Sequence, residues 1–219
     1  MERDAEGQDV DFILTDLHPH ITAWKQARDA SEYGALGYVP APVDAARATK
    51  EILELAQAGK KKDGRTARRE KQSQKKMFRL FSLAFHHFDD DLAVKILRNT
   101  LQTSDGFAIF ELQGRDVGNL FTVLAMAPVL MAGSWWWFWG QWTHLFWTYI
   151  IPVVPFVLVY DGLVSCLRTR REGEIMALLR KASSGIDGGW EGWTFEVGEE
   201  LHTWPGGTIS YFVGVKSAE

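Results

Sequence analysis

Short apolar runs alternate with helical patterns through the first half of the chain. Apolar runs at residues 10–15, 38–39, 77–84 and 106–112 are typical of buried strands. Apolar residues with helical spacing lie between them, at 21–30, at 43–59 and after Asp89, whose side chain suits a helix N-cap. Strands that alternate with helices in this way predict an open, mostly parallel α/β sheet.

The last quarter of the chain has a different pattern. Residues 163–170 and 172–181 are helical in spacing, whereas residues 192–197 and 208–215 alternate between polar and apolar as strands do. A turn signal, Pro205-Gly206-Gly207, stands between these two strands. We therefore expect an antiparallel β-hairpin at the end of the chain.

Residues 117–160 contain no Asp, Glu, Lys or Arg, and six of the 10 tryptophans of the chain fall from Trp135 to Trp147. The halves of this block, 120–139 and 142–160, each approach the roughly 20 residues that a membrane-spanning helix needs. Tryptophans near their junction suit a membrane interface, and Arg115 and the basic residues 168–171 flank the block. The pattern predicts insertion into a membrane or tight association with its surface, so a membrane lipid is the expected partner.

A second interpretation of this block is a buried helical insertion that covers the sheet or lines an apolar pocket. Pro128, Pro152 and Pro155 would interrupt long regular helices, and open α/β folds do bury nearly continuous apolar runs. Both interpretations stay open at this point.

The charge balance narrows the expected partners. A formal net charge of −4 gives no reason to expect nucleic acid. One cysteine, Cys166, and a polar first segment without a secretory pattern favour an intracellular location. The charged segment 59–76 fits either a solvated loop or a basic patch for anionic lipid.

A series of polar residues at predicted strand ends carries a family resemblance. Asp16 ends the first strand, Asp44 follows the second, and Phe85-His86-His87-Phe88 follows the third, with Asp161-Gly162-Leu163 further along. In order and spacing, the chain resembles class I S-adenosylmethionine-dependent methyltransferases, within a bacterial and fungal methyltransferase-like subgroup. The resemblance implies a Rossmann-like sheet that ends in an antiparallel hairpin, and S-adenosylmethionine as the cofactor.

The resemblance also implies roles for named residues. It places Asp16 and Leu17 at the cofactor ribose, Asp44 and Ala45 near the adenine, and Phe85 beside the cofactor. It places His86 and His87 near the methyl-transfer cleft, where a histidine can act as a general base toward a hydroxyl or amine.

Each of these residues also has a structural interpretation. Asp16 can form an Asx turn before Pro19, Asp44 can cap the following helix, and the histidines can simply line a cleft. No Cys/His spacing completes a zinc set, so we expect no metal site.

The resembled family begins with a strand and a glycine-rich turn, and that strand lies between the one that ends at Asp16 and the one near Met77. Only nine residues precede the Asp16 strand here, with Gly7 as their one glycine. We therefore expect an N-terminally truncated sheet, weak or absent cofactor binding and marginal stability. The expected divisions are a partial cofactor-binding α/β domain at 1–116, the apolar helical insertion at 117–160, and helices with the hairpin at 161–219.

Three functions follow as hypotheses. The first is methyl transfer from S-adenosylmethionine to an unknown small-molecule or lipid acceptor, with the protein acting at the membrane in which the acceptor dissolves. The second is a catalytically inactive, truncated homologue that acts by association with a membrane or a partner. The third is a small membrane protein whose α/β part only docks another protein.

Overall fold

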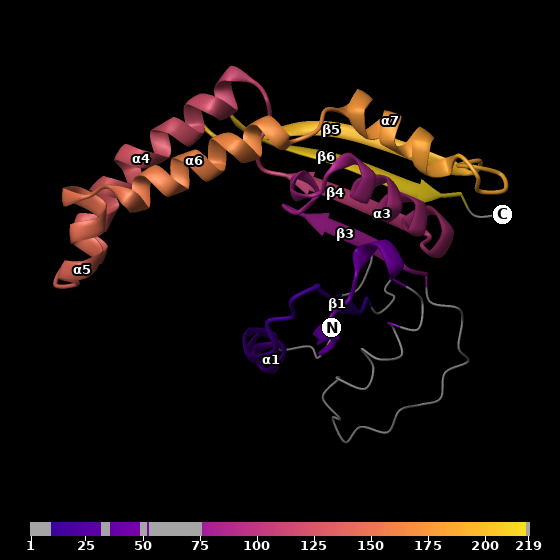
Figure 1. Ribbon diagram of the computed structural model, residues 1–219, viewed down its shortest axis with the longest axis horizontal. Coiled ribbons are helices and arrows are strands. Elements are labelled where there is room, and N and C mark those ends of the chain that lie inside the picture. Colours follow the sequence, from indigo (N-terminus) through magenta and orange to yellow (C-terminus); the bar gives the residue numbers. More distant parts are fainter. Residues whose placement is uncertain (1–9, 32–35, 49–51, 53–75, 218–219) are drawn as a thin grey trace. The chain divides into compact units, whose positions relative to one another are not determined.

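A computed structural model describes residues 10–31, 36–48, 52 and 76–217 (Figure 1). The chain divides into two compact units, the first made of residues 1–77 and 95–105 and the second of residues 78–94 and 106–219. Among the described residues, the strands form two separate sheets, with two strands in one and four in the other. The architecture is mixed α/β, as predicted.

The first unit contains a small parallel sheet, the helix that connects its strands, and residues 95–105, most of which belong to helix α3 (Asp90–Thr103). Strands β1 (Phe12–Leu14) and β2 (Leu36–Tyr38) pair in parallel, and helix α1 (Ile21–Ala30) connects them along the chain. The rings of Trp24 and Tyr38 lie 6.2 Å apart and tie the helix to β2. Of the predicted helix 43–59, the 3-10 turn η1 (Ala45–Arg47) and one helical residue, Ile52, are described. Residues 59–75 of the charged segment lie outside the described residues.

The second unit holds a sheet with the strand order β3-β4-β6-β5. Strands β3 (Phe78–Ser82) and β4 (Gly106–Glu111) are parallel, with helix α3 (Asp90–Thr103) between them along the chain. Strand β6 (Gly207–Lys216) is antiparallel to both β4 and β5 (Trp193–Thr203), which confirms the predicted hairpin. The sheet is therefore mixed rather than mostly parallel, because the hairpin contributes two antiparallel strands.

Aromatic side chains from three neighbouring strands of this sheet contact one another and form part of its core. Phe107 and Phe212 are almost completely buried, and their rings stack 6.1 Å apart. Phe195 contacts both rings from β5. Helix α7 (Glu172–Ser183) has an amphipathic pattern and buries Leu178 and Leu179 along its apolar side.

The uncharged block forms a helical hairpin. Helix α4 (Val117–Trp137) lies beside α6 (Val153–Arg168), as Figure 1 shows, and the short helix α5 (Trp142–Leu145) and the π-helix η3 (Phe146–Ile150) connect them. Gly162 allows close contact, because a Cβ there would lie 2.7 Å from Val123 Cγ1.

The three prolines of the block have different consequences. Helix α4 continues through Pro128, so the predicted interruption there is wrong. Pro152 stands between η3 and α6, and Pro155 lies in the first turn of α6, where a missing N–H removes no helical hydrogen bond.

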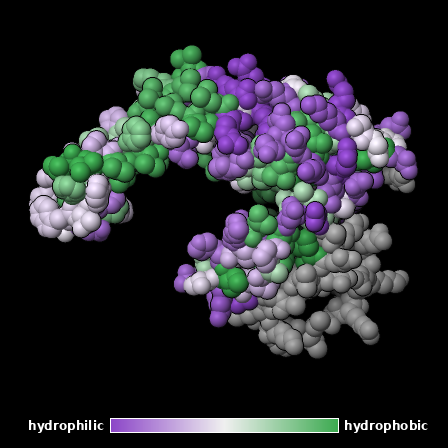
Figure 2. All heavy atoms as spheres, in the orientation of Figure 1, coloured by the Kyte–Doolittle hydropathy of each residue, from purple (hydrophilic) through white to green (hydrophobic). Residues whose placement is uncertain are grey.

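The surface of the helical hairpin is apolar, and most of it is exposed rather than packed against other described residues. Figure 2 shows hydrophobic residues gathered along α4 and α6. Only 17% of the most apolar stretch of α4 is buried, and Val129 is 70% exposed. By length and composition α4 is able to cross a membrane, and residues Trp142–Ile150 (α5 and η3) form with α6 a second, broken candidate that is bent by 63°.

A polar network joins the start of the hairpin to the sheet. Asp116 accepts a hydrogen bond from the Asn119 backbone N–H at 2.9 Å and so caps α4. The buried amide of Asn119 donates to Thr208 Oγ1 at 2.8 Å and accepts from the Thr208 backbone N–H at 3.1 Å. Gly206 faces Gly118 here, and a Cβ on Gly206 would lie 2.6 Å from Gly118 Cα.

Candidate functional site

The carboxyl ends of the parallel strands β3 and β4 bring two polar side chains together. After β3 the chain turns through Leu83, which has a φ of 53° and is therefore in the left-handed region that non-glycine residues rarely adopt. The 3-10 turn η2 (Phe85–His87) follows and places His86 opposite Glu111, the last residue of β4. Ligands of open α/β sheets commonly bind at this edge.

His86 and Glu111 form a buried pair. Glu111 Oε2 lies 2.7 Å from His86 Nδ1, and Glu111 Oε1 accepts the His86 backbone N–H at 3.0 Å. Both side chains are 6% exposed. An ionised carboxylate accepts a hydrogen bond from Nδ1–H, and in that tautomer of the ring Nε2 is the nitrogen that accepts a proton. Nε2 makes no hydrogen bond to any described residue.

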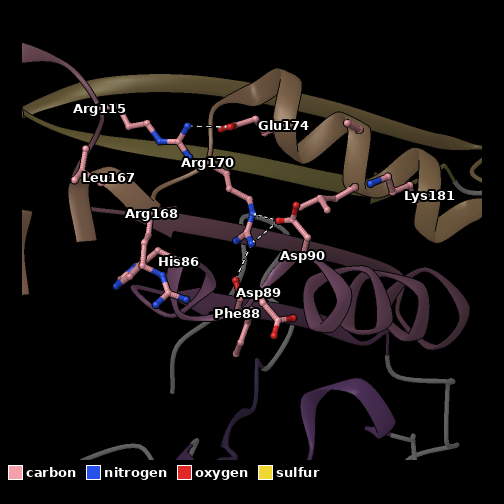
Figure 3. Close-up of a pocket in the computed structure, with 12 residues that line it drawn as sticks. His86, Phe88, Asp89, Asp90, Arg115, Leu167, Arg168, Arg170, Glu174 and Lys181 are labelled. Carbon is pink, nitrogen blue, oxygen red and sulfur yellow. Dashed lines mark hydrogen bonds and ion pairs between the residues drawn. The ribbon is translucent and has the colours of Figure 1, made fainter. Parts of the chain in front are cut away.

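A cavity of about 530 Å³ opens beside this pair. Figure 3 shows side chains from η2, the start of α3, the end of α6 and α7 around it. Besides His86, its lining is rich in charged groups: Asp89, Asp90, Arg115, Arg168, Arg170, Glu174 and Lys181. The volume suits a small molecule or a polar headgroup.

Arg170 holds the walls of the cavity together. Its guanidinium donates to the backbone carbonyls of Phe85 and Phe88, at 3.0 and 2.7 Å, and to Asp90 at 2.9 Å. The guanidinium also lies over the Phe85 ring, 5.3 Å from its centroid. Because the Arg170 side chain is only 9% exposed, these contacts satisfy a buried charge.

A second ion pair joins Arg115, just before α4, to Glu174 of α7 at 2.9 Å. The Arg171 backbone N–H donates to the Glu174 carboxylate, and this bond, with Arg115, holds the pKa of Glu174 below its ordinary value. Arg115 Nε is buried and has no hydrogen-bond partner among the described residues.

The structure gives different surroundings to the two histidines and to Phe85. His86 is buried and lines the cavity, whereas His87 is exposed, with its ring 4.1 Å from the His86 ring. Phe85 is 1% exposed and contacts Phe81 and Phe88, so its ring lies in the core rather than on an open surface.

The predicted cofactor residues of the first unit lie close together but bond to their own backbone. The Val43 N–H donates to the Asp16 carbonyl at 2.9 Å, so the segments of Asp16 and Asp44 are neighbours. Asp16 Oδ1 accepts from His18 N–H at 2.7 Å, and Asp44 Oδ1 accepts from Ala46 N–H at 2.8 Å. These are the Asx turn and the cap that the sequence also allowed, and Leu17 beside Asp16 is exposed.

Sequence reasoning missed Glu111 and the arginines of the cavity. Glu111 does carry a signal, because it is the one charged residue in the apolar run 106–112. The sequence indicates Arg168 and Arg170 only as flanks of the apolar block, and nothing in their spacing indicates contact with η2. Within the described ranges, no group of three or more His, Cys, Asp or Glu side chains is placed to hold a metal ion.

Comparisons with known proteins add no family to this geometry. No protein-family model matches the chain, and no curated protein or solved structure matches it either.

Proposed function

We propose that this chain is a membrane-associated, methyltransferase-like protein that transfers a methyl group from S-adenosylmethionine to a membrane-dissolved acceptor. The observation that carries the proposal is the site at the carboxyl ends of β3 and β4, where a buried His86–Glu111 pair borders a cavity beside the apolar hairpin.

The sheets support the family part of the proposal. The resembled methyltransferases end their sheet in an antiparallel hairpin, and β5 and β6 form such a hairpin beside β4.

The cofactor fits the described residues in part. Asp16 is exposed, and its Oδ2 makes no hydrogen bond to a described residue, so it is able to accept a ribose hydroxyl. Asp44 and Ala45 lie on the neighbouring segment and would border the adenine. A glycine-rich turn for the methionine end is not among the described residues. S-adenosylmethionine supplies a methyl group activated by its sulfonium.

The chain itself would supply a base and an apolar approach. His86 Nε2 would take the proton of an acceptor hydroxyl or amine, and Glu111 would keep the other nitrogen protonated and the ring oriented. The uncovered surfaces of α4 and α6 would hold the protein at the membrane that dissolves the acceptor.

The two adjacent histidines offer a matched test of the site. The purified chain is incubated with membrane extracts and S-adenosylmethionine labelled in its methyl group, and label is followed into the lipid fraction. We expect His86→Gln to lower transfer by about 100-fold, within the range for a general base, and His87→Gln to leave it nearly unchanged. Equal loss in both variants would contradict the assignment of His86.

A second candidate function is a catalytically inactive homologue that acts through the membrane or a partner. The specific observation in its favour is that Asp16 and Asp44 each direct one carboxylate oxygen to their own backbone. Cofactor binding separates this candidate from the enzyme, because an inactive homologue does not require it.

A further inference from the structure

The cavity beside His86 lies where the apolar hairpin joins the sheet. Arg115 stands two residues before α4 begins, and Leu167 and Arg168 form the end of α6. Leu167 is 62% exposed, so an apolar side chain stands at the rim of a polar cavity. A hairpin inserted from these helix ends would place the cavity at the depth of lipid headgroups.

The acidic groups of the cavity are already bound within the chain. Asp89 accepts the Leu92 N–H at 2.8 Å and caps α3, Asp90 binds Arg170, and Glu174 binds Arg115 and the Arg171 N–H. These contacts neutralise Arg170 and much of Arg115.

Two arginines keep hydrogen-bond donors in the cavity. Arg168 gives one hydrogen bond, to the His87 carbonyl at 3.0 Å, and forms no ion pair with a described carboxylate. Arg115 Nε is buried without an acceptor in the described part of the chain. Nε itself is closed to solvent, but the Arg115 side chain is 29% exposed and lines the cavity, so its positive charge attracts an anion there. Lys181 adds a further positive charge to the lining.

From these donors we infer that the cavity binds the phosphate of a membrane lipid headgroup. Guanidinium groups bind phosphate oxygens strongly and often through two parallel hydrogen bonds. The inference deepens the proposed function and rests on its membrane association, because it names a phosphate-bearing amphiphile as the class of acceptor or bound lipid.

Vesicle flotation of the full chain tests the inference. Binding is measured to phosphatidylcholine vesicles with and without phosphatidic acid, for the wild type, Arg168→Gln and Arg180→Gln. Arg180 is an exposed residue of α7 that does not line the cavity, so its variant matches the change in charge. We expect phosphatidic acid to strengthen the binding of the wild type to vesicles. For vesicles with phosphatidic acid, Arg168→Gln should bind about tenfold more weakly than the wild type, and Arg180→Gln should bind as the wild type does.

The arms of the experiment separate the possible failures. No flotation with either vesicle would overturn the membrane association itself and the headgroup site with it. Flotation with phosphatidylcholine but no gain from phosphatidic acid would overturn the headgroup site alone. Equal losses in the two variants would mean general surface charge, which also overturns it. The detergent-solubilised chain is also tested with inorganic phosphate. If it binds inorganic phosphate as tightly as it binds vesicles with phosphatidic acid, and Arg168→Gln loses this binding, the phosphate need not come from a lipid and the inference is overturned.

Discussion

Asn119 joins the helical hairpin to the sheet through its side-chain amide. It is 2% exposed, and its amide contacts Asp116 at the start of α4 and both the hydroxyl and the backbone of Thr208 on β6. Burial raises the pKa of Asp116, but hydrogen bonds from the Asn119 side chain and backbone outweigh it and hold that pKa below its ordinary value. One side chain therefore joins a helix cap to a strand.

We expect Asn119→Ala to lower the free energy of unfolding by about 1–3 kcal/mol, because the Thr208 N–H and hydroxyl lose their partner. Urea unfolding in detergent measures the change. Gln102→Ala, which removes an exposed amide from α3, is the matched control and should change stability by less than about 0.5 kcal/mol. Equal effects of the two substitutions would contradict the role of the network.

Glu174 gives the molecule an acid-sensitive contact. Because the pKa of Glu174 is lower in the folded chain, its ionised form stabilises the fold above its ordinary pKa of 4.5, and this contribution is lost as the pH falls below that value. We expect Glu174→Gln to be less stable than the wild type at neutral pH and the difference to vanish in acid. Unfolding curves at several pH values measure it. A difference that does not change with pH would contradict the ion pair with Arg115.

At the scale of elements, the hairpin of α4 and α6 departs most from a soluble α/β protein. Its tryptophans cluster near the turn, where the rings of Trp135 and Trp139 lie 4.9 Å apart and Trp136 is 84% exposed. Aromatic side chains of this kind are typical of a membrane interface. The helices contact each other through small and apolar groups, and their remaining apolar surfaces are uncovered in the second unit.

A charge in the middle of α4 tests this element. We expect Val129→Lys to weaken flotation with phosphatidylcholine vesicles strongly, since a lysine at the centre of a spanning helix costs about 2.5–3.5 kcal/mol. Val197→Lys, at a position of β5 that is 39% exposed, makes the same change outside the hairpin and should leave flotation unchanged. Retained flotation of the Val129→Lys variant would contradict insertion of α4.

Several elements are predictable from local patterns alone. Helix α1 has the predicted bounds, α7 ends two residues beyond its prediction, and Asp89 caps α3 through Leu92. Strand β5 extends to Thr203, six residues further than its alternation indicates, because β6 pairs with it along that length. Pairing energy from a partner strand is not visible in the pattern of one strand.

The site was less predictable than the elements. His86 was predicted from its place after a strand, but Glu111 becomes its partner only because β3 and β4 lie side by side in parallel register. Arg168 and Arg170 reach η2 across more than 80 residues of sequence, as their hydrogen bonds to the carbonyls of His87 and Phe85 show. Such contacts depend on the tertiary fold, and spacing along the chain carries no sign of them.

At the scale of the whole molecule, the described strands form two sheets with separate edges. The first unit carries Asp16 and Asp44, the predicted cofactor residues, and the second carries the His86–Glu111 pair and its cavity. Methyl transfer requires the chain to bind S-adenosylmethionine. Cofactor binding is therefore the property on which the proposed function depends.

Calorimetric titration of the full chain with S-adenosylmethionine tests this dependence most directly. The proposed function predicts binding with a dissociation constant on the order of micromolar, which Asp16→Ala abolishes because the ribose loses its carboxylate. Asp11→Ala removes a carboxylate just before the same strand, whereas Asp16 follows it, and should leave cofactor binding intact. No heat of binding at millimolar cofactor would contradict methyl transfer and leave the two non-catalytic hypotheses, an inactive homologue and a small membrane protein that docks another protein.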